Sequence, residues 1–327
     1  MSRGSRAVSR SQKGFTRSKT LLGRLKSGDQ IAYLITAACA ASIFVVTVLL
    51  VYQLWINSSL ARHKFGWDFL SKSTWDPVAG EFGALPFIYG TVVTSILALL
   101  LAVPLGLGAA IFLAELAPPK ISDFLTFLIE LLAAVPSVIF GLLGIFLLLP
   151  ALQHMVPVLQ QFLGFLPIFT GRFYGVSIFS AGVVLSLMIV PFITSVSREV
   201  LLAVPQDQKE AALALGATRW QATSRVVVPF ARRGILGSVF LALARALGET
   251  MAVTMVIGNT PQIKLSLLAP GYSIAAVIAN EFTEATEDVY VNALILLGLV
   301  LFGITIIINA LARLLILTTT QKGTEGR

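Results

Sequence analysis

Cysteine, histidine and charged residues are all scarce in this chain of 327 residues. Cys39 is the single cysteine, so no disulfide can form within the chain. Asp, Glu, Lys and Arg make up 12% of the residues, whereas a soluble domain carries about 25%. Because 56% of the residues are hydrophobic, the chain must be solvated largely by something other than water. The composition therefore indicates a membrane protein.

The nucleotide-binding pattern G-x4-G-K-[ST] is also missing. That loop cradles the phosphates of ATP and holds its magnesium ion. We therefore predict that the chain is not an enzyme and binds no cofactor, and that any ATP and Mg²⁺ bind to a partner ATPase. His63 and His154 fall in different predicted outer loops without the spacing of metal ligands, so no metal site is predicted.

Long apolar runs account for most of the sequence. A helix that crosses a bilayer needs about 20 mostly apolar residues, and six segments satisfy this requirement. They are residues 31–56, 85–114, 124–150, 176–197, 234–258 and 291–312. We predict an all-α polytopic membrane protein with six transmembrane helices over residues 31–317. Glu130 is expected near the cytoplasmic end of the third span, in a structural role.

The basic residues predict the orientation. The segments on the same side of the membrane as the N-terminus hold 18 Lys and Arg residues, and the loops on the other side hold five. Arg245 lies within a span. Because Lys and Arg collect on the cytoplasmic side, both termini are predicted to be cytoplasmic. This asymmetry explains the net charge of +8, so nucleic acid is not an expected partner. The basic tail, residues 1–30, is predicted to be disordered at its start and followed by an uncleaved anchor; contact with anionic membrane lipid is the second interpretation. Residues 318–327 form the cytoplasmic C-terminal tail.

The cytoplasmic loop over residues 198–233 has the signals of two helices. Pro205 suits a first helical turn, and Gly216 suits the position just after a helix end. Thr218 and Gln221 have the spacing of a capping box that begins the second helix. The first helix is rich in alanine and suits a groove on another protein. DNA recognition by this helix–turn–helix is disfavoured because the loop is short and flanked by membrane spans.

This loop resembles the EAA motif of binding-protein-dependent ABC importer permeases. Glu210, Ala211 and Ala212 are followed by Gly216 at the matching distance, and Val226-Val227-Val228-Pro229 replaces the pattern I-x-L-P. The resemblance implies that residues 206–216 form the coupling helix, which docks on the ATPase. It implies a fold like that of type I ABC importer permeases.

A second feature is "RALGET" at residues 245–250, inside the predicted fifth span. Arg245 and Glu249 are four residues apart, which places them on one face of a helix. An arginine at the centre of a membrane helix costs at least ~2.5–3.5 kcal/mol, which favours a role in a polar pathway over a salt bridge without function. A guanidinium matches the oxygens of phosphate, and a carboxylate can accept the P–OH proton that sulfate lacks. We hypothesise that the pair admits phosphate and rejects sulfate.

The run that begins with RALGET is similar to the signature of the phosphate-specific permease family PstC. Further segments resemble that family in order and spacing: "ALPFIYGTVVTS" (84–95), "FLAELAP" (112–118), "IELLAAVPSVIFG" (129–141) and "ANEFTEA" (279–285). The sister permease PstA shares the architecture, and the first outer loop with Trp75 and Pro77 favours PstC. The resemblance implies that Arg245 and Glu249 take part in phosphate translocation in the cell inner membrane. It implies as partners a PstA-like permease, a PstB-like ATPase dimer and an extracytoplasmic PstS-like phosphate-binding protein.

Other functions remain as alternatives. A secondary transporter would need no ATPase, and the EAA loop argues against it. A sulfate, molybdate or amino-acid ABC permease would share the loop, and substrate competition would distinguish it. A structural or signalling subunit would tolerate the loss of Arg245. The outer acidic stretch Glu281, Glu284, Glu287 and Asp288 is expected to be solvated, with a partner contact as the alternative.

Overall fold

The computed structural model describes residues 28–321. It divides into two units, Met1–Gln53 and Leu54–Arg327. Helix α2 (Gly28–Asn57) supplies the described part of the first unit and continues into the second. The predictions for residues 1–27 and 322–327, which cover most of the two tails, lie outside the described residues.

The described residues of the second unit form helices, their connecting loops and one short hairpin, in which Trp75 of β1 pairs with Phe82 of β2. Its first half contains α3 (Ser59–Phe65), α4 (Asp68–Ser71), β1 (Trp75–Asp76), β2 (Glu81–Phe82), α5 (Leu85–Ile111), η1 (Phe112–Leu116), α6 (Pro119–Ala133), α7 (Ser137–Leu143), η2 (Gly144–Leu148), α8 (Leu149–Leu163) and η3 (Pro167–Phe169). Its second half contains α9 (Ile178–Leu202), α10 (Gln206–Ala214), α11 (Arg219–Ala222), η4 (Thr223–Val227), α12 (Val228–Leu247), α13 (Met251–Thr254), α14 (Ile274–Glu281) and α15 (Asp288–Gln321).

Within residues 28–321, six helical segments are long and apolar enough to cross a membrane. They are Gln30–Asn57, Leu85–Leu116, Ser137–Phe162, Ile178–Leu202, Arg219–Leu247 and Asp288–Leu314. The prediction of an all-α protein with six spans is therefore confirmed.

The third predicted helix, over residues 124–150, is wrong. Helix α6 ends at Ala133, and Pro136 adopts an extended conformation before α7 begins at Ser137. Proline has no N–H to donate and its ring clashes with the preceding turn, so the chain breaks here rather than bending. The third candidate span is Ser137–Phe162, which places His154 within it and not in a loop. Glu130 lies on α6, before that span, and is exposed.

The fifth predicted helix, over residues 234–258, is also wrong at both ends. The candidate span begins at Arg219 and ends at Leu247. It joins α11, η4 and α12 into a continuous helical segment, so the second helix of the cytoplasmic loop and the fifth span are one element. Residues 248–250 are not helical, and α13 follows after this interruption.

Helix α9 is the centre of the second unit. In the most apolar stretch of α9, 72% of the residues are buried, whereas the share is 22–28% in the other candidate spans of this unit. Small residues let the neighbouring helices approach it closely. A Cβ atom on Gly106 of α5 would lie 2.9 Å from Ile193 of α9, and the Thr194 hydroxyl donates to the Gly106 carbonyl at 3.2 Å. Helices α5 and α12 pack against α9 through Ala98, Ala102, Ala242 and Ala246.

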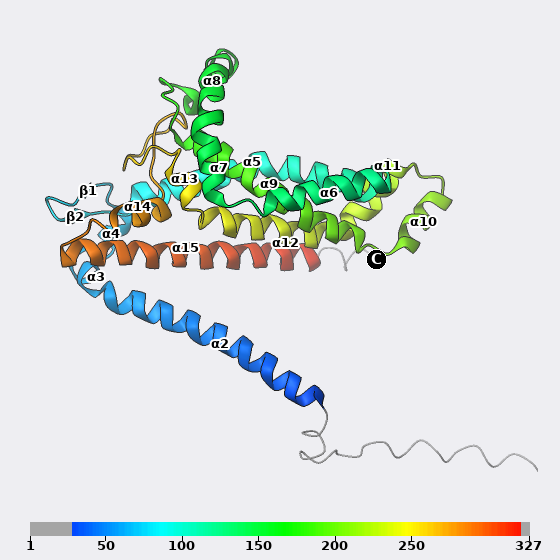
Figure 1. The fold of residues 1–327 in the computed structure, drawn as a ribbon, viewed down its shortest axis with the longest axis horizontal. Coiled ribbons are helices and arrows are strands. Elements are labelled where there is room, and N and C mark those ends of the chain that lie inside the picture. Colours follow the sequence, from blue (N-terminus) through cyan, green and yellow to red (C-terminus); the bar gives the residue numbers. More distant parts are fainter. Residues whose placement is uncertain (1–27, 322–327) are drawn as a thin grey trace, which may run out of the picture. The chain divides into compact units, whose positions relative to one another are not determined.

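The two ends of the second unit carry different elements. Figure 1 shows α3, α4, the β1–β2 hairpin and α14 at one end, and α10 and α11 at the other. A second apolar core around Phe69, Phe82 and Phe87 fills the end with the hairpin. The helix–turn–helix that contains α10 is thus separated from this hairpin by the length of the bundle.

Candidate functional site

The backbone interruption at residues 248–250 is partly exposed and lies near the middle of α9. The guanidinium carbon of Arg245 lies 5.7 Å from the centre of the Phe192 ring, and Phe192 is two residues from the middle of α9. After the interruption the chain forms α13 and reaches Val256. The Val256 carbonyl accepts a hydrogen bond from the N–H of Ser177, the residue just before α9. Non-helical backbone at membrane depth is tolerated only where protein buries it or where it lines a polar cavity.

Arg245 lies in the last turn of α12 and its side chain is exposed in the single chain. Leu241, one turn earlier, is 54% exposed, and Met251 beyond the interruption is 46% exposed. These residues form an uncovered face that contains a guanidinium beside an aromatic ring. The cation–π contact with Phe192 orients the arginine but satisfies none of its five N–H donors.

Glu249 lies outside α12, in the interruption itself. Its Oε1 atom accepts from the backbone N–H of Ala252 at 3.2 Å, which helps to start α13. The side chain is half-buried. One carboxylate oxygen thus accepts from the backbone, and within the described residues the other accepts no hydrogen bond.

The prediction that Arg245 and Glu249 share one helix face is wrong. Helix α12 ends at Leu247, because residues 248–250 form a turn and irregular backbone and do not continue the helix. Within the described residues no ion pair joins the two side chains. Arg245 lies in the last turn of α12 and Glu249 in the interruption that follows, so the geometry does not support the alternative of a self-neutralising salt bridge.

The predicted coupling loop has the expected local structure. Helix α10 ends at Ala214 and is followed by Gly216 at φ +85°; the Gly216 N–H donates to the Leu213 carbonyl, and the Ala217 N–H donates to the Ala212 carbonyl. This pair of bonds is the Schellman motif, and a side chain at Gly216 would strain it. Thr218 and Gln221 form a reciprocal capping box at the start of α11. The local sequence signals at both helix ends are thus confirmed.

Helix α10 presents small and apolar side chains to its surroundings. Glu210 and Ala211 are exposed, Ala212 is half-buried, and Leu215 at the helix end is 90% exposed. Trp220 on α11 is 58% exposed. Pro229 is exposed near the start of α12, just after the wide turn η4. An uncovered narrow helix of this kind suits a groove on a partner protein.

Two ionisable residues near α10 were not expected from the sequence. Lys209 of α10 and Glu115 of η1 form an ion pair with an Nζ–Oε1 distance of 2.6 Å. Their side chains are 12% and 10% exposed. The residues are 94 positions apart, so no local spacing could have indicated the pair.

At the opposite end of the bundle, Glu281 anchors the outer hairpin. Its Oε2 atom accepts from Trp75 Nε1 at 2.8 Å and from the Tyr290 hydroxyl at 2.7 Å. The prediction that Glu281 is solvated is therefore wrong, whereas Glu284, Glu287 and Asp288 are exposed. Nearby, burial raises the pKa of Tyr272 to about 12, so this phenol stays neutral and accepts from the Asn280 amide.

Sequence comparison extends these observations to most of the chain. Residues 102–319 match the family described as "Binding-protein-dependent transport system inner membrane component". A "Phosphate transport system permease protein PstC" from Mesorhizobium japonicum is 46% identical over 294 residues, covering 88% of this chain and 90% of the relative. A protein of the same name from Haemophilus influenzae is 46% identical over 297 residues, covering 89% and 93%.

Solved structures support the fold. A chain of a bacterial ABC transporter involved in the import of the acidic polysaccharide alginate aligns with a TM-score of 0.55, covering 89% of this chain and 98% of that chain. The sequences are 18% identical, so this likeness concerns the fold alone. From the matched family and the close relatives, the chain belongs to the binding-protein-dependent transport system inner membrane components, as a member of the phosphate permease family PstC.

Proposed function

We propose that this permease subunit of a phosphate ABC transport system forms the anion pathway beside the interruption of its fifth span. Arg245 attracts the phosphate, and Glu249 accepts its P–OH proton. Helix α10, with Glu210, Ala211, Ala212 and Gly216, receives the ATPase subunit, and Pro229 lies near the start of the helix that leads to the pathway. ATP and Mg²⁺ bind to that ATPase and not to this chain.

The observation that carries this proposal is an exposed arginine next to non-helical backbone, near the middle of the buried helix α9. Hydrocarbon cannot satisfy either group, and ionisable side chains in membrane segments usually face a polar pathway or the interior of the bundle. An anion pathway satisfies both, because guanidinium and backbone N–H groups bind phosphate oxygens.

The uncovered face around Arg245 further supports a second permease subunit. Leu241 and Met251 flank the arginine and are about half exposed, and no lipid surface suits a guanidinium between them. A PstA-like subunit placed against this face would close the pathway between two chains. A PstS-like binding protein would deliver phosphate at the end that carries the β1–β2 hairpin.

Orientation and energy supply are consistent with this assignment. With α10 on the cytoplasmic side, the excess of basic residues falls inside, and both termini are cytoplasmic. Moving a dianion inward against an inside-negative potential costs ~4.6 kcal/mol per 100 mV, twice the value for one charge. Import therefore needs an energy source such as ATP hydrolysis.

The test is uptake of labelled phosphate by the assembled complex in proteoliposomes. We expect uptake that requires ATP and that excess sulfate does not inhibit. Uptake that continues without the ATPase would instead indicate a secondary transporter. Strong inhibition by sulfate would leave an ABC permease in place but contradict the proposed role of Glu249.

Replacing Glu249 by glutamine should relax the discrimination against sulfate. The amide oxygen still accepts from Ala252, so α13 keeps its start, while the negative charge that repels a fully ionised anion is gone. We expect inhibition by sulfate to strengthen at least about tenfold, because hydrogen bonds with charged groups contribute about 1.5–3 kcal/mol. Competition between labelled phosphate and sulfate measures this.

The matched control is Glu130→Gln, since Glu130 is an exposed glutamate on α6, away from the interruption. Its competition profile should equal that of the unchanged complex. A Glu249→Gln complex with intact uptake and unchanged selectivity would rule out the proton-acceptor role.

A further inference from the structure

The ion pair between Lys209 and Glu115 stands out because the rest of α10 is open. Glu210, Ala211 and Leu215 are exposed, whereas the Lys209 side chain is 12% exposed and turned toward η1. The Nζ–Oε1 distance of 2.6 Å is that of a charge-assisted hydrogen bond. Lys209 thus joins the coupling loop, which lies between the fourth and fifth spans, to the end of the second span.

Burial makes this contact specific. Removing two charges from water is unfavourable unless they are paired, and removing one partner leaves the other charge buried and uncompensated. Exposed ion pairs such as Lys72–Asp68, with side chains 56% and 72% exposed, contribute little. The Lys209–Glu115 pair therefore resists separation in a way that an exposed pair does not.

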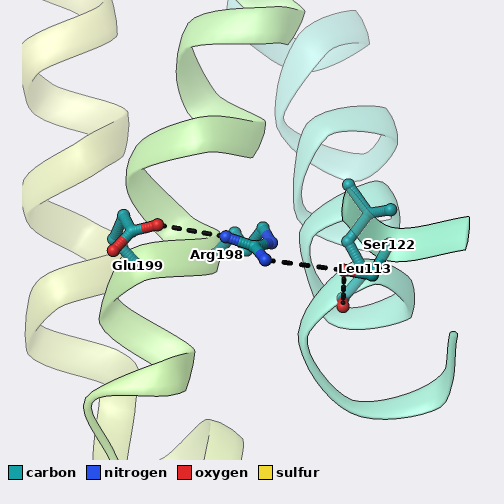
Figure 2. A network of polar contacts seen from close by, with 4 residues as sticks. All are labelled: Leu113, Ser122, Arg198 and Glu199. Carbon is teal, nitrogen blue, oxygen red and sulfur yellow. Dashed lines mark hydrogen bonds and ion pairs between the residues drawn. The ribbon is translucent and has the colours of Figure 1, made fainter. Parts of the chain in front are cut away.

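The segment that Lys209 reaches is held from a second side. Figure 2 shows Arg198 of α9 extending toward Ser122 of α6, with an Nη2–Oγ distance of 3.5 Å. The Ser122 hydroxyl in turn donates to the Leu113 carbonyl of η1 at 2.8 Å (Figure 2). The segment η1 is one wide helical turn at the end of α5, a geometry often found at functional positions. It therefore connects α5, α6, α9 and α10.

We propose that Lys209 is a positioning residue for energy coupling, and that its ion pair with Glu115 makes the end of α5 move together with α10. The neighbouring α11 continues directly into α12, so chain connectivity already links the loop to the fifth span. The ion pair adds the second span, and a displacement of α10 by the ATPase then acts on two spans that pack against α9. This inference rests on the proposed docking of the ATPase on α10.

The test compares transport with ATP hydrolysis in the same proteoliposomes, for Lys209→Met, Glu115→Gln and the charge-swapped double variant Lys209→Glu with Glu115→Lys. We expect each single variant to lower the phosphate moved per ATP hydrolysed at least about fivefold, the low end of typical coupling between sites. The swap should restore much of that ratio. Lys120→Met is the control, because Lys120 is an exposed lysine of α6 at the same end, and it should leave the ratio unchanged.

The ratio separates positioning from stability. A purely structural role would reduce the amount of complex and lower both activities together, so an unchanged ratio in the single variants would overturn the proposal. A swap that assembles but does not restore the ratio would overturn it as well. ATP-dependent uptake by the unchanged complex is measured alongside, and its absence would contradict the proposed function rather than the role of Lys209.

Discussion

Phosphate uptake should fall at least about 30-fold when Arg245 is replaced by glutamine, because truncating one member of a desolvated charge pair costs roughly 2 kcal/mol or more. Glutamine retains polarity and much of the length but loses the charge that attracts the anion. The side chain is exposed and lies over the face of Phe192, and within the described residues it forms no hydrogen bond or ion pair, so folding should be unaffected. Initial rates of ATP-dependent uptake, normalised to assembled complex, measure the effect.

The control for this prediction is Arg172→Gln. Arg172 also lies over an aromatic ring, 5.9 Å from the centre of Tyr174, but it belongs to the segment between the third and fourth candidate spans. It should transport at the rate of the unchanged complex. If Arg245→Gln did the same, Arg245 would have no part in the pathway, and a structural or signalling role would be favoured.

Replacing Ala211 by arginine should detach the ATPase. Ala211 is exposed on α10, so the larger side chain does not disturb the subunit itself but blocks seating of the narrow helix in a groove. Central interface residues commonly contribute about 2 kcal/mol or more, so the dissociation constant should rise at least about 30-fold. Titration of the ATPase onto the detergent-solubilised permease pair measures it.

Ala211→Ser is the matched variant, since it keeps a small side chain at the same position. It should bind the ATPase within about twofold of the unchanged subunit, because near-neutral contacts surround the few strong ones in an interface. Normal binding by Ala211→Arg would show that α10 does not enter a groove at this position.

Local signals explain why the fold class and the cytoplasmic loop were predictable. Run length and hydropathy identify spans, and Gly216 with Thr218 and Gln221 encodes two helix ends within a few residues. The effect of Pro136 was harder to predict, because a proline in an apolar run can either bend a helix or end it. The residues before it, 124–133, are as apolar as many membrane spans. Only the packing of α6 as a separate helix decides between these two.

The features of the site depend on tertiary structure to different degrees. The residue types in RALGET indicated an anion site, but the end of α12 at Leu247 has no unambiguous local signal, since glycine also occurs inside membrane helices. The Lys209–Glu115 and Glu281–Trp75 contacts join residues 94 and 206 positions apart. Such contacts follow from the packing of whole helices, so spacing along the chain does not reveal them.

The continuous helical segment from Arg219 to Leu247 has a mechanical consequence. Its 29 residues form a rod about 43 Å long at about 1.5 Å per residue, with the capping box before one end and Arg245 in the last turn of the other. The wide turn η4 and Pro229 are the places near its foot where such a segment can bend, and no further proline follows up to Leu247. If the ATPase docks on α10 as proposed, a displacement of the cytoplasmic loop would reach the guanidinium through this one helical segment, with bending confined to its foot.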